Sequence, residues 1–163
     1  MEKINKREVS EADALRRLSA LCARGEHSEG EVRQKMRQWG LDSEAQERIV
    51  KKLTDNQFVD NERYCRMFIA DKLRFNQWGR RKIEQALQQK GIPRQTYQPM
   101  LSAIDTSTFA DILRPLLEAK RKTIRAASPY EMKMKLARFA MSRGFETREI
   151  NICIDDIDID DDF

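Results

Sequence analysis

Residues 79–92 read Gly-Arg-Arg-Lys-Ile-Glu-Gln-Ala-Leu-Gln-Gln-Lys-Gly-Ile, and the pattern of this stretch occurs three times in the chain. In each copy a basic amphipathic segment ends at a glycine, which is Gly40, Gly91 or Gly144, and a second amphipathic segment follows. When these glycines are aligned, the apolar positions coincide at Val32, Ile83 and Leu136, at Met36, Leu87 and Ala140, at Leu41, Ile92 and Phe145, at Ile49, Met100 and Cys153, and at Leu53, Ile104 and Ile157. These spacings suit one face of a helix, a break at the glycine, and one face of a second helix.

The three glycines are predicted to be left-handed C-caps, because only glycine takes a positive φ without steric cost. Their separations of 51 and 53 residues indicate tandem modules. The chain is therefore predicted to be all-α, with three tandem three-helix repeats stacked into an elongated array. The expected divisions are a flexible lead-in at 1–10, repeats at 11–58, 59–105 and 106–157, and an acidic tail at 158–163.

Composition agrees with a soluble, helix-rich protein. Only 7% of the 163 residues are aromatic and 36% are charged, with six glycines and four prolines, which argues against a β-sandwich. The longest apolar run, Met67–Ala70, is far too short to span a membrane, and residues 1–6 lack the apolar core of a signal peptide. We therefore expect a cytoplasmic protein that does not contact a membrane.

The cysteines agree with a reducing compartment. Cys22, Cys65 and Cys153 are odd in number and contain no Cys-x-x-Cys pair, which disfavours a disulfide or zinc framework. All three fall within helical apolar patterns, so we expect small core residues.

Two local patterns make further structural predictions. Ser28 and Glu31 have the spacing of a capping box, in which the serine oxygen and the glutamate carboxylate each accept a bond from a backbone amide. Pro115 lies inside the first apolar stripe of the third repeat, and it predicts a kink or a late helix start.

No catalytic constellation is visible. His27 is the only histidine, so any His-based triad or metal site depends on this one residue, whose place beside a helix cap suits a solvated side chain. The aspartate-rich end lacks the glycine and the closing glutamate of a calcium loop, and no glycine-rich phosphate loop occurs. We therefore expect no metal, no cofactor and no enzymatic activity.

The formal net charge of +4 combines two oppositely charged parts. Residues 155–163 hold six aspartates and no basic residue, which leaves 31 basic against 21 acidic side chains in the rest of the chain. A basic body and an acidic tail make separate predictions about partners. The tail is expected to be mobile and to compete with external phosphate for the basic faces, the alternative being a solubilising end without a role.

Basic residues gather in two windows, at 72–94 and 114–148. The first holds seven basic residues and one acid, and the second holds ten against three acids, so a polyanion is the natural partner. The alternative is an ordinary solvated helix face. The residues predicted to bind the polyanion are Arg63, Arg80, Arg81, Lys82, Lys120, Arg121, Lys122, Arg138 and Arg143. Arg80, Arg81 and Lys82 are expected on an exposed first helical turn, while Trp39 and Trp78 are expected to seal joints between helices rather than stack on bases.

The chain resembles the RecX regulators of the bacterial RecA recombinase. In the first repeat the matching residues are Arg24, Ser28, Glu31, Val32, Lys35, Met36 and Gly40. The denser match in the second repeat consists of residues 60–65, Phe68, Ile69, Lys72, residues 79–83, Leu87 and residues 90–92. The third repeat adds residues 135–139 and 143–145. The resemblance extends from Ala14 to Ile157, and two departures are Ala86, where the family often has an acid, and the aspartate-rich end.

The resemblance implies a curved array of three-helix repeats that lies in the groove of the RecA–DNA filament. It implies a non-enzymatic regulator that modulates, usually inhibits, strand exchange and co-protease activity in DNA repair and the SOS response. The implied partners are the RecA filament and single- and double-stranded DNA, and we expect a monomer.

A helix-turn-helix transcriptional regulator is the alternative, because three-helix units with a glycine turn are its building block. The helices after Gly40 and Gly144 begin with acidic residues, which would face phosphate, whereas the helix that begins near Pro93 would permit base contacts. Preference for the filament over naked DNA would favour the regulator, and sequence-selective binding to duplex would favour the alternative.

Overall fold

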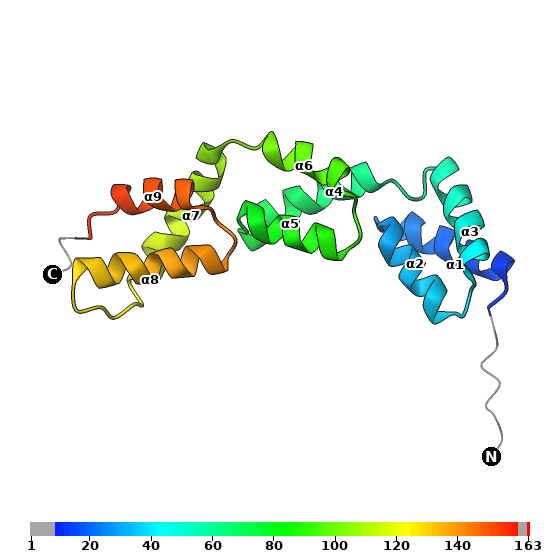
Figure 1. Ribbon diagram of the computed structural model, residues 1–163, viewed down its shortest axis with the longest axis horizontal. Coiled ribbons are helices and arrows are strands. Elements are labelled where there is room, and N and C mark those ends of the chain that lie inside the picture. Colours follow the sequence, from blue (N-terminus) through cyan, green and yellow to red (C-terminus); the bar gives the residue numbers. More distant parts are fainter. Residues whose placement is uncertain (1–8, 160–162) are drawn as a thin grey trace, which may run out of the picture.

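All regular elements that the computed structural model describes, over residues 9–159 and 163, are helices. They are α1 (Glu11–Arg24), α2 (Glu29–Gln38), α3 (Ser43–Asp55), α4 (Asn61–Asp71), the π-helical turn η1 (Lys72–Asn76), α5 (Arg80–Gln89), α6 (Arg94–Ser102), α7 (Thr106–Arg121), α8 (Pro129–Ser142) and α9 (Thr147–Asp156). Helices α1–α3, α4–α6 and α7–α9 form repeats 1, 2 and 3, which follow one another in an elongated, curved array (Figure 1). The predicted fold class is confirmed. Most of the expected lead-in and part of the expected tail lie outside the described residues.

The three aligned glycines end the middle helix of each repeat in the same way. Gly40, Gly91 and Gly144 have φ angles of +80°, +75° and +89°, so the predicted left-handed C-caps are confirmed. In each case the next residue's amide bonds to the carbonyl five positions earlier, at distances of 3.1, 3.2 and 3.1 Å. This is the Schellman arrangement, and it turns the chain sharply into the third helix.

The predicted capping box at the start of α2 forms only by half. The Ser28 hydroxyl accepts a hydrogen bond from the Glu31 amide at 3.2 Å, as expected. The Glu31 carboxylate does not return to the Ser28 amide, because it is bonded to side chains of repeat 2 and to His27. A reciprocal box occurs instead at α9, between Glu146 and Glu149.

Helix α7 runs from Thr106 through Pro115 to Arg121, so the predicted late start is wrong. Proline removes one hydrogen bond, the one that the Asp111 carbonyl would accept. Both Asp111 and Pro115 are exposed, and water can satisfy that carbonyl. The apolar stripe of Phe109, Leu113 and Leu117 on the opposite face stays fully buried and holds the helix together.

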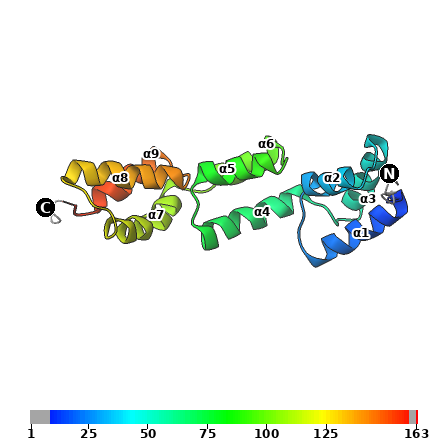
Figure 2. The same cartoon turned by 90° about the horizontal axis from the view of Figure 1, so that it is seen from below.

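The middle helices α8, α5 and α2 lie end to end along the array (Figure 2). At the joint between repeats 3 and 2, the amides of Gly79 and Arg81 donate to the carbonyls of Arg143 and Gly144 at 2.8 and 3.0 Å. The amino end of α5 therefore satisfies carbonyls at the carboxyl end of α8, and the two helix dipoles meet with opposite partial charges.

Only glycine fits at this joint. A Cβ atom at Gly79 would lie 2.2 Å from the backbone of Gly144, and one at Gly144 would lie 2.5 Å from the amide nitrogen of Lys82. The joint between α2 and α5 uses the same device, because a Cβ at Gly30 would lie 2.2 Å from the Lys90 carbonyl oxygen. Close backbone approach therefore sets the spacing of the repeats.

The buried apolar side chains of the described residues form two separate clusters. One lies within repeat 1 and includes Leu18, Met36, Ile49 and Leu53. The other unites repeats 2 and 3 and extends from Tyr64 to Ile159. On the repeat 3 side of the joint, Phe109 packs against Phe145, with ring centroids 6.5 Å apart in an edge-to-face arrangement.

We predict that Gly79→Ala lowers the free energy of unfolding by about 2 kcal/mol or more, because the added methyl group meets backbone that cannot move independently. Urea unfolding followed by circular dichroism measures the effect. The control is Gly25→Ala, because nothing lies within 4 Å of a Cβ at Gly25 and its φ of −177° suits any residue. Equal stability of the two variants would contradict the role of the joint.

Candidate nucleic-acid interface

Repeat 2 holds two lysines against the ring of one tryptophan. The Nζ atoms of Lys72 and Lys82 each lie 4.7 Å from the Trp78 ring centroid, and Lys72 also lies 5.2 Å from the Phe68 centroid. Trp78 is partly buried against the core of repeats 2 and 3, which fixes the ring. Lys72 Nζ also lies 3.5 Å from the side-chain oxygen of Asn76. Within the described part of the chain neither lysine forms an ion pair with a carboxylate, so both charges can attract an external anion.

The local backbone explains why these residues meet. Helix α4 passes at Lys72 into the π-helical turn η1, which ends at Gln77 in the left-handed conformation, with φ of +48°. The Lys72 carbonyl accepts the Trp78 amide at 3.1 Å. This turn brings Trp78 back over Lys72 immediately before α5 begins.

A smaller arrangement of the same kind occurs in repeat 3. Lys120 Nζ lies 5.0 Å from the Phe139 ring centroid, and the Arg143 guanidinium carbon lies 5.8 Å from it. Cations held over aromatic rings lose less side-chain freedom on meeting phosphate than extended lysines do. In repeat 3, Lys120 is therefore held over an aromatic ring much as Lys72 and Lys82 are in repeat 2.

Arg80 is not on an exposed turn, contrary to the sequence-based expectation. Its side chain is 21% exposed and forms an ion pair with Glu146 at 3.1 Å. It also donates to the carbonyls of Leu101 and Ile104, and its guanidinium carbon lies 4.7 Å from the Phe109 ring centroid. The reason is geometric, because the tight contact of α5 with α8 directs the first residue of α5 into the joint.

Two further arginines of the predicted set also hold joints together. Arg63 donates to Glu26 at 2.6 Å and to the Gln57 carbonyl at 3.0 Å, which ties repeat 2 to repeat 1. Arg143 donates to the Asn76 carbonyl at 2.6 Å, which ties repeat 3 to repeat 2. These bonds occupy groups that a ligand would otherwise use.

The remaining predicted residues divide by their surroundings. Arg81, Lys122 and Arg138 are exposed, and the described residues provide them with no ion pair. Arg121 is engaged, because it pairs with Glu118 at 3.7 Å and donates to the Asp158 carbonyl at 3.2 Å. The structure thus does not bring the nine predicted residues into one patch.

The last residue of α9 and the segment that follows it lie against α7. Asp156 pairs with Arg114 at 3.0 Å, and Ile157 and Ile159 are both buried in the shared core. A cavity of about 370 Å³ at the carboxyl end of α7 is lined by Arg121, Lys122, Ile124, Arg125, Ala126, Met132 and Phe163. Opposite charges therefore meet at this end of the array.

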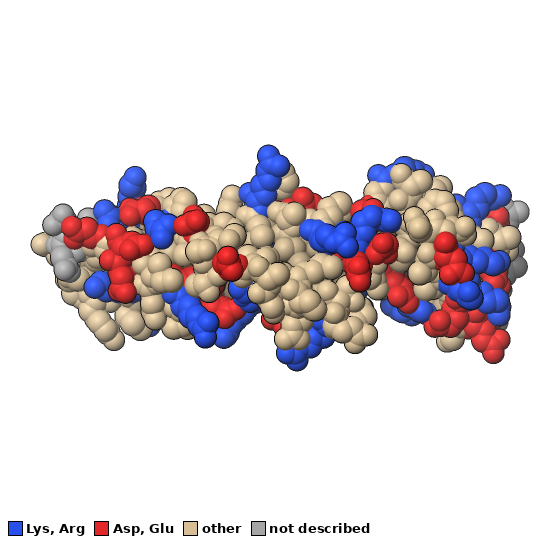
Figure 3. Space-filling model, turned by 90° about the horizontal axis from the view of Figure 1, so that it is seen from above, with Lys and Arg blue, Asp and Glu red and all other residues tan. Residues whose placement is uncertain are grey.

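The surface charges are mixed on the face seen in Figure 3, where acidic side chains gather over the C-terminal end and both signs intermingle over repeat 1. No helix of the described residues is long and apolar enough to cross a membrane. These residues also include no group of three or more His, Cys, Asp or Glu side chains that would suit a metal ion.

Sequence reasoning missed the role of Lys72 and the order around Trp78. Lys72 lies in η1, Trp78 lies in the connection after it and Lys82 lies in α5, so the periodicity of a single helix does not relate the three residues. The available signal was the aromatic residue set between two basic positions in the most basic window of the chain. Trp78 packs at a joint, as expected, and also supports two cations.

Comparison with known proteins gives three family matches. The models described as the first, second and third three-helix domains of RecX match residues 12–53, 60–98 and 110–154. Together they cover most of the chain and coincide with its three repeats.

Curated relatives share the same name, "Regulatory protein RecX". The protein of Clostridium perfringens strain 13 is 31% identical over 121 residues, which cover 73% of this chain and 56% of the relative. The protein of Chlorobaculum tepidum is 29% identical over 143 residues, which cover 88% and 87%. The chain thus spans about half the length of the clostridial relative and most of the chlorobial one.

Solved structures agree on the fold. A crystal structure of regulatory protein RecX superposes with a TM-score of 0.82 at 21% identity, over 89% of this chain and 73% of that one. RecX from Lactobacillus salivarius superposes with a TM-score of 0.81 at 17% identity, over 91% and 97%.

We predict that the neighbouring arginines Arg80 and Arg81 separate stability from binding. Arg80→Gln removes an ion pair and two hydrogen bonds in a joint and should lower the free energy of unfolding by about 2 kcal/mol. Arg81→Gln should change it by less than about 0.5 kcal/mol while weakening binding to a single-stranded oligonucleotide. Urea unfolding and fluorescence anisotropy measure the two quantities. If Arg81→Gln binds the oligonucleotide as tightly as wild type does, Arg81 is not part of the binding surface.

Proposed function

The chain belongs to the RecX family of regulatory proteins, and on this premise we propose that it binds the RecA–DNA filament and inhibits strand exchange and co-protease activity. It acts in the cytoplasm, in DNA repair and the SOS response, as a monomer without enzymatic activity, metal or cofactor. Its contacts include single- and double-stranded DNA as well as recombinase.

The observation that supports this proposal best is the Lys72–Trp78–Lys82 arrangement in an end-to-end array. Two cations are held over one ring and lack carboxylate partners in the described structure. A filament repeats its phosphates at regular intervals, and a chain of linked repeats gains from effective concentration when several weak sites engage together. An occupied groove would exclude a second duplex.

The helix-turn-helix alternative requires base-reading residues at the amino end of a third helix. Helix α3 begins with Ser43 and Glu44 behind an Asp42 cap, and α9 begins behind the Glu146 cap, so both ends are acidic. Helix α6 begins with Arg94 and stays permissive. The relative affinities for filament, bare single strand and duplex of different sequences separate the two functions.

We expect preference for a RecA–DNA filament over bare single strand, and for both over duplex of any sequence. The logarithm of affinity should fall linearly with the logarithm of salt concentration, with a slope of roughly 0.9 per neutralised duplex phosphate. Anisotropy titrations at two salt concentrations measure both. A preference for one duplex sequence would favour the transcriptional regulator. An affinity that does not change with salt concentration would contradict phosphate contact.

Replacing Lys72 and Lys82 together by Gln should weaken filament binding by roughly tenfold, because two phosphate contacts are lost. The matched control replaces Lys51 and Lys52 by Gln, which removes the same charge from α3 in repeat 1. Both doubly substituted proteins should keep the wild-type melting temperature. Equal binding by the two would overturn the assignment of the lysine pair.

The C-terminal acidic residues are predicted to restrain binding in competition with phosphate. The expected tail covers residues 158–163, but Ile159 is only 1% exposed, so removing the whole tail would damage the core. The appropriate truncation therefore follows Ile159. It removes three aspartates, Asp160–Asp162, which lie outside the described residues, and Phe163 from the basic cavity. The truncated protein should bind DNA more tightly at low salt, and the gain should fade as salt screens the charges. Equal low-salt affinity would rule the restraint out.

A further inference from the structure

Both joints bring a glycine close to the backbone of the neighbouring repeat. Within the described residues, however, the joint between repeats 1 and 2 lacks the shared apolar core that the joint between repeats 2 and 3 has. Buried apolar side chains cross from repeat 2 to repeat 3 in one continuous cluster, whereas the cluster of repeat 1 is separate within the described residues. Closely packed apolar side chains resist relative movement, because sliding them past one another opens voids. Repeats 2 and 3 therefore form one body, and repeat 1 is attached to it by other means.

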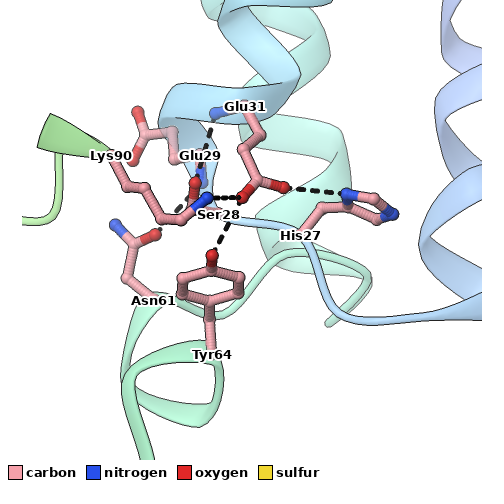
Figure 4. Close-up of polar contacts among 7 residues, drawn as sticks. All are labelled: His27, Ser28, Glu29, Glu31, Asn61, Tyr64 and Lys90. Carbon is pink, nitrogen blue, oxygen red and sulfur yellow. Dashed lines mark hydrogen bonds and ion pairs between the residues drawn. The ribbon is translucent and has the colours of Figure 1, made fainter. Parts of the chain in front are cut away.

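Glu31 is the centre of that attachment (Figure 4). Its Oε1 atom accepts hydrogen bonds from Lys90 Nζ at 3.0 Å and the Tyr64 hydroxyl at 2.9 Å, both from repeat 2. Its Oε2 atom lies 2.9 Å from His27 Nδ1. Burial opposes ionisation of this carboxyl, but bonds from Lys90, His27 and Tyr64 outweigh it and lower the pKa of Glu31. One ionised carboxylate thus makes two of the bonds across the joint.

The other bonds across the joint are also polar. Arg63 reaches Glu26 at 2.6 Å, and the Glu29 amide donates to Asn61 at 3.1 Å. Side-chain exposures of 39% for Arg63 and 36% for Lys90 show that water reaches these groups. Such bonds exchange for bonds to water at little net loss, and salt weakens the charged ones.

The chain fixes where movement would occur. Val59 is 3% exposed in the core of repeat 1, and the next residue, Asp60, accepts the Arg63 amide at 3.1 Å as the cap of α4. Val59 is therefore fixed in repeat 1 and Asp60 is fixed in repeat 2, so the backbone torsions between these two residues are where the chain can turn. Hollows of about 400 Å³, beside α2 and α5, and about 330 Å³, beside α3 and α4, leave space next to the joint.

We propose that repeat 1 swings as a rigid unit against the body of repeats 2 and 3, pivoting at Val59–Asp60, with the Glu31 contacts to Lys90 and Tyr64 as the latch. The swing changes the distance between the cations of repeat 1 and those of repeats 2 and 3, while the latter keep fixed spacing. This swing is a property of the free protein and does not depend on which partner the protein binds.

The test uses spin-label distance distributions measured by double electron–electron resonance. In a Cys22→Ala background, which leaves the fully buried Cys65 and Cys153, one label pair at Gln38→Cys and Gln95→Cys spans the joint. A reference pair at Gln95→Cys and Asn151→Cys lies within the body of repeats 2 and 3. All three labelled positions, Gln38, Gln95 and Asn151, are exposed in the native structure.

The spanning pair should give a broader distribution than the reference pair, and Glu31→Gln, Lys90→Gln or high salt should broaden it further. The matched control is Glu29→Gln, because that carboxylate pairs with Arg33 inside repeat 1 at 2.7 Å; it should leave the distribution unchanged. Equal widths for both pairs, in wild type and in Glu31→Gln, overturn the pivot. A spanning-pair distribution unaffected by both Glu31→Gln and Lys90→Gln overturns the latch. Circular dichroism confirms that repeat 1 stays folded in each variant.

Discussion

The contact of backbone with backbone at Gly79 and Gly144 is the constraint on which the rest of the array depends. It places the amino end of α5 directly on the carboxyl end of α8, so that amides of one helix satisfy carbonyls of the other. The same approach directs Arg80 into the core of the joint and leaves Arg81 outside. The two neighbouring arginines thus differ in role because of a backbone contact at which no side chain fits.

The glycine register was predictable from sequence because it reports local backbone geometry. Aligned apolar positions such as Val32, Ile83 and Leu136 are all fully buried, as the spacing indicates. Glu31 was not predictable in the same way, because its partners Tyr64 and Lys90 come from another repeat. A capping-box spacing describes what is possible within one helix, and here a distant partner competes for the same carboxylate.

In the candidate interface, too, contacts between repeats could not be predicted from the sequence. Sequence identified the basic windows correctly as regions of excess charge, but it could not separate cations that hold joints from cations that face solvent. Arg143 and Arg81 look equivalent in the sequence, yet one bonds to the Asn76 carbonyl and the other is exposed. The distinction depends on the element lying opposite, which only the arrangement of repeats determines.

The division of the apolar core has a consequence for how the chain folds during synthesis. Every buried residue of the first cluster lies between Ala14 and Val59, so repeat 1 can complete its core soon after it leaves the ribosome. The second cluster needs Cys153, Ile157 and Ile159 together with Tyr64, and it stays unfinished until almost one hundred further residues have emerged. Contacts between distant residues form slowly because loop closure precedes them. A nascent chain that has not yet released residue 159 would therefore expose the apolar residues of the second cluster, and this stretch is the part that chaperones would meet.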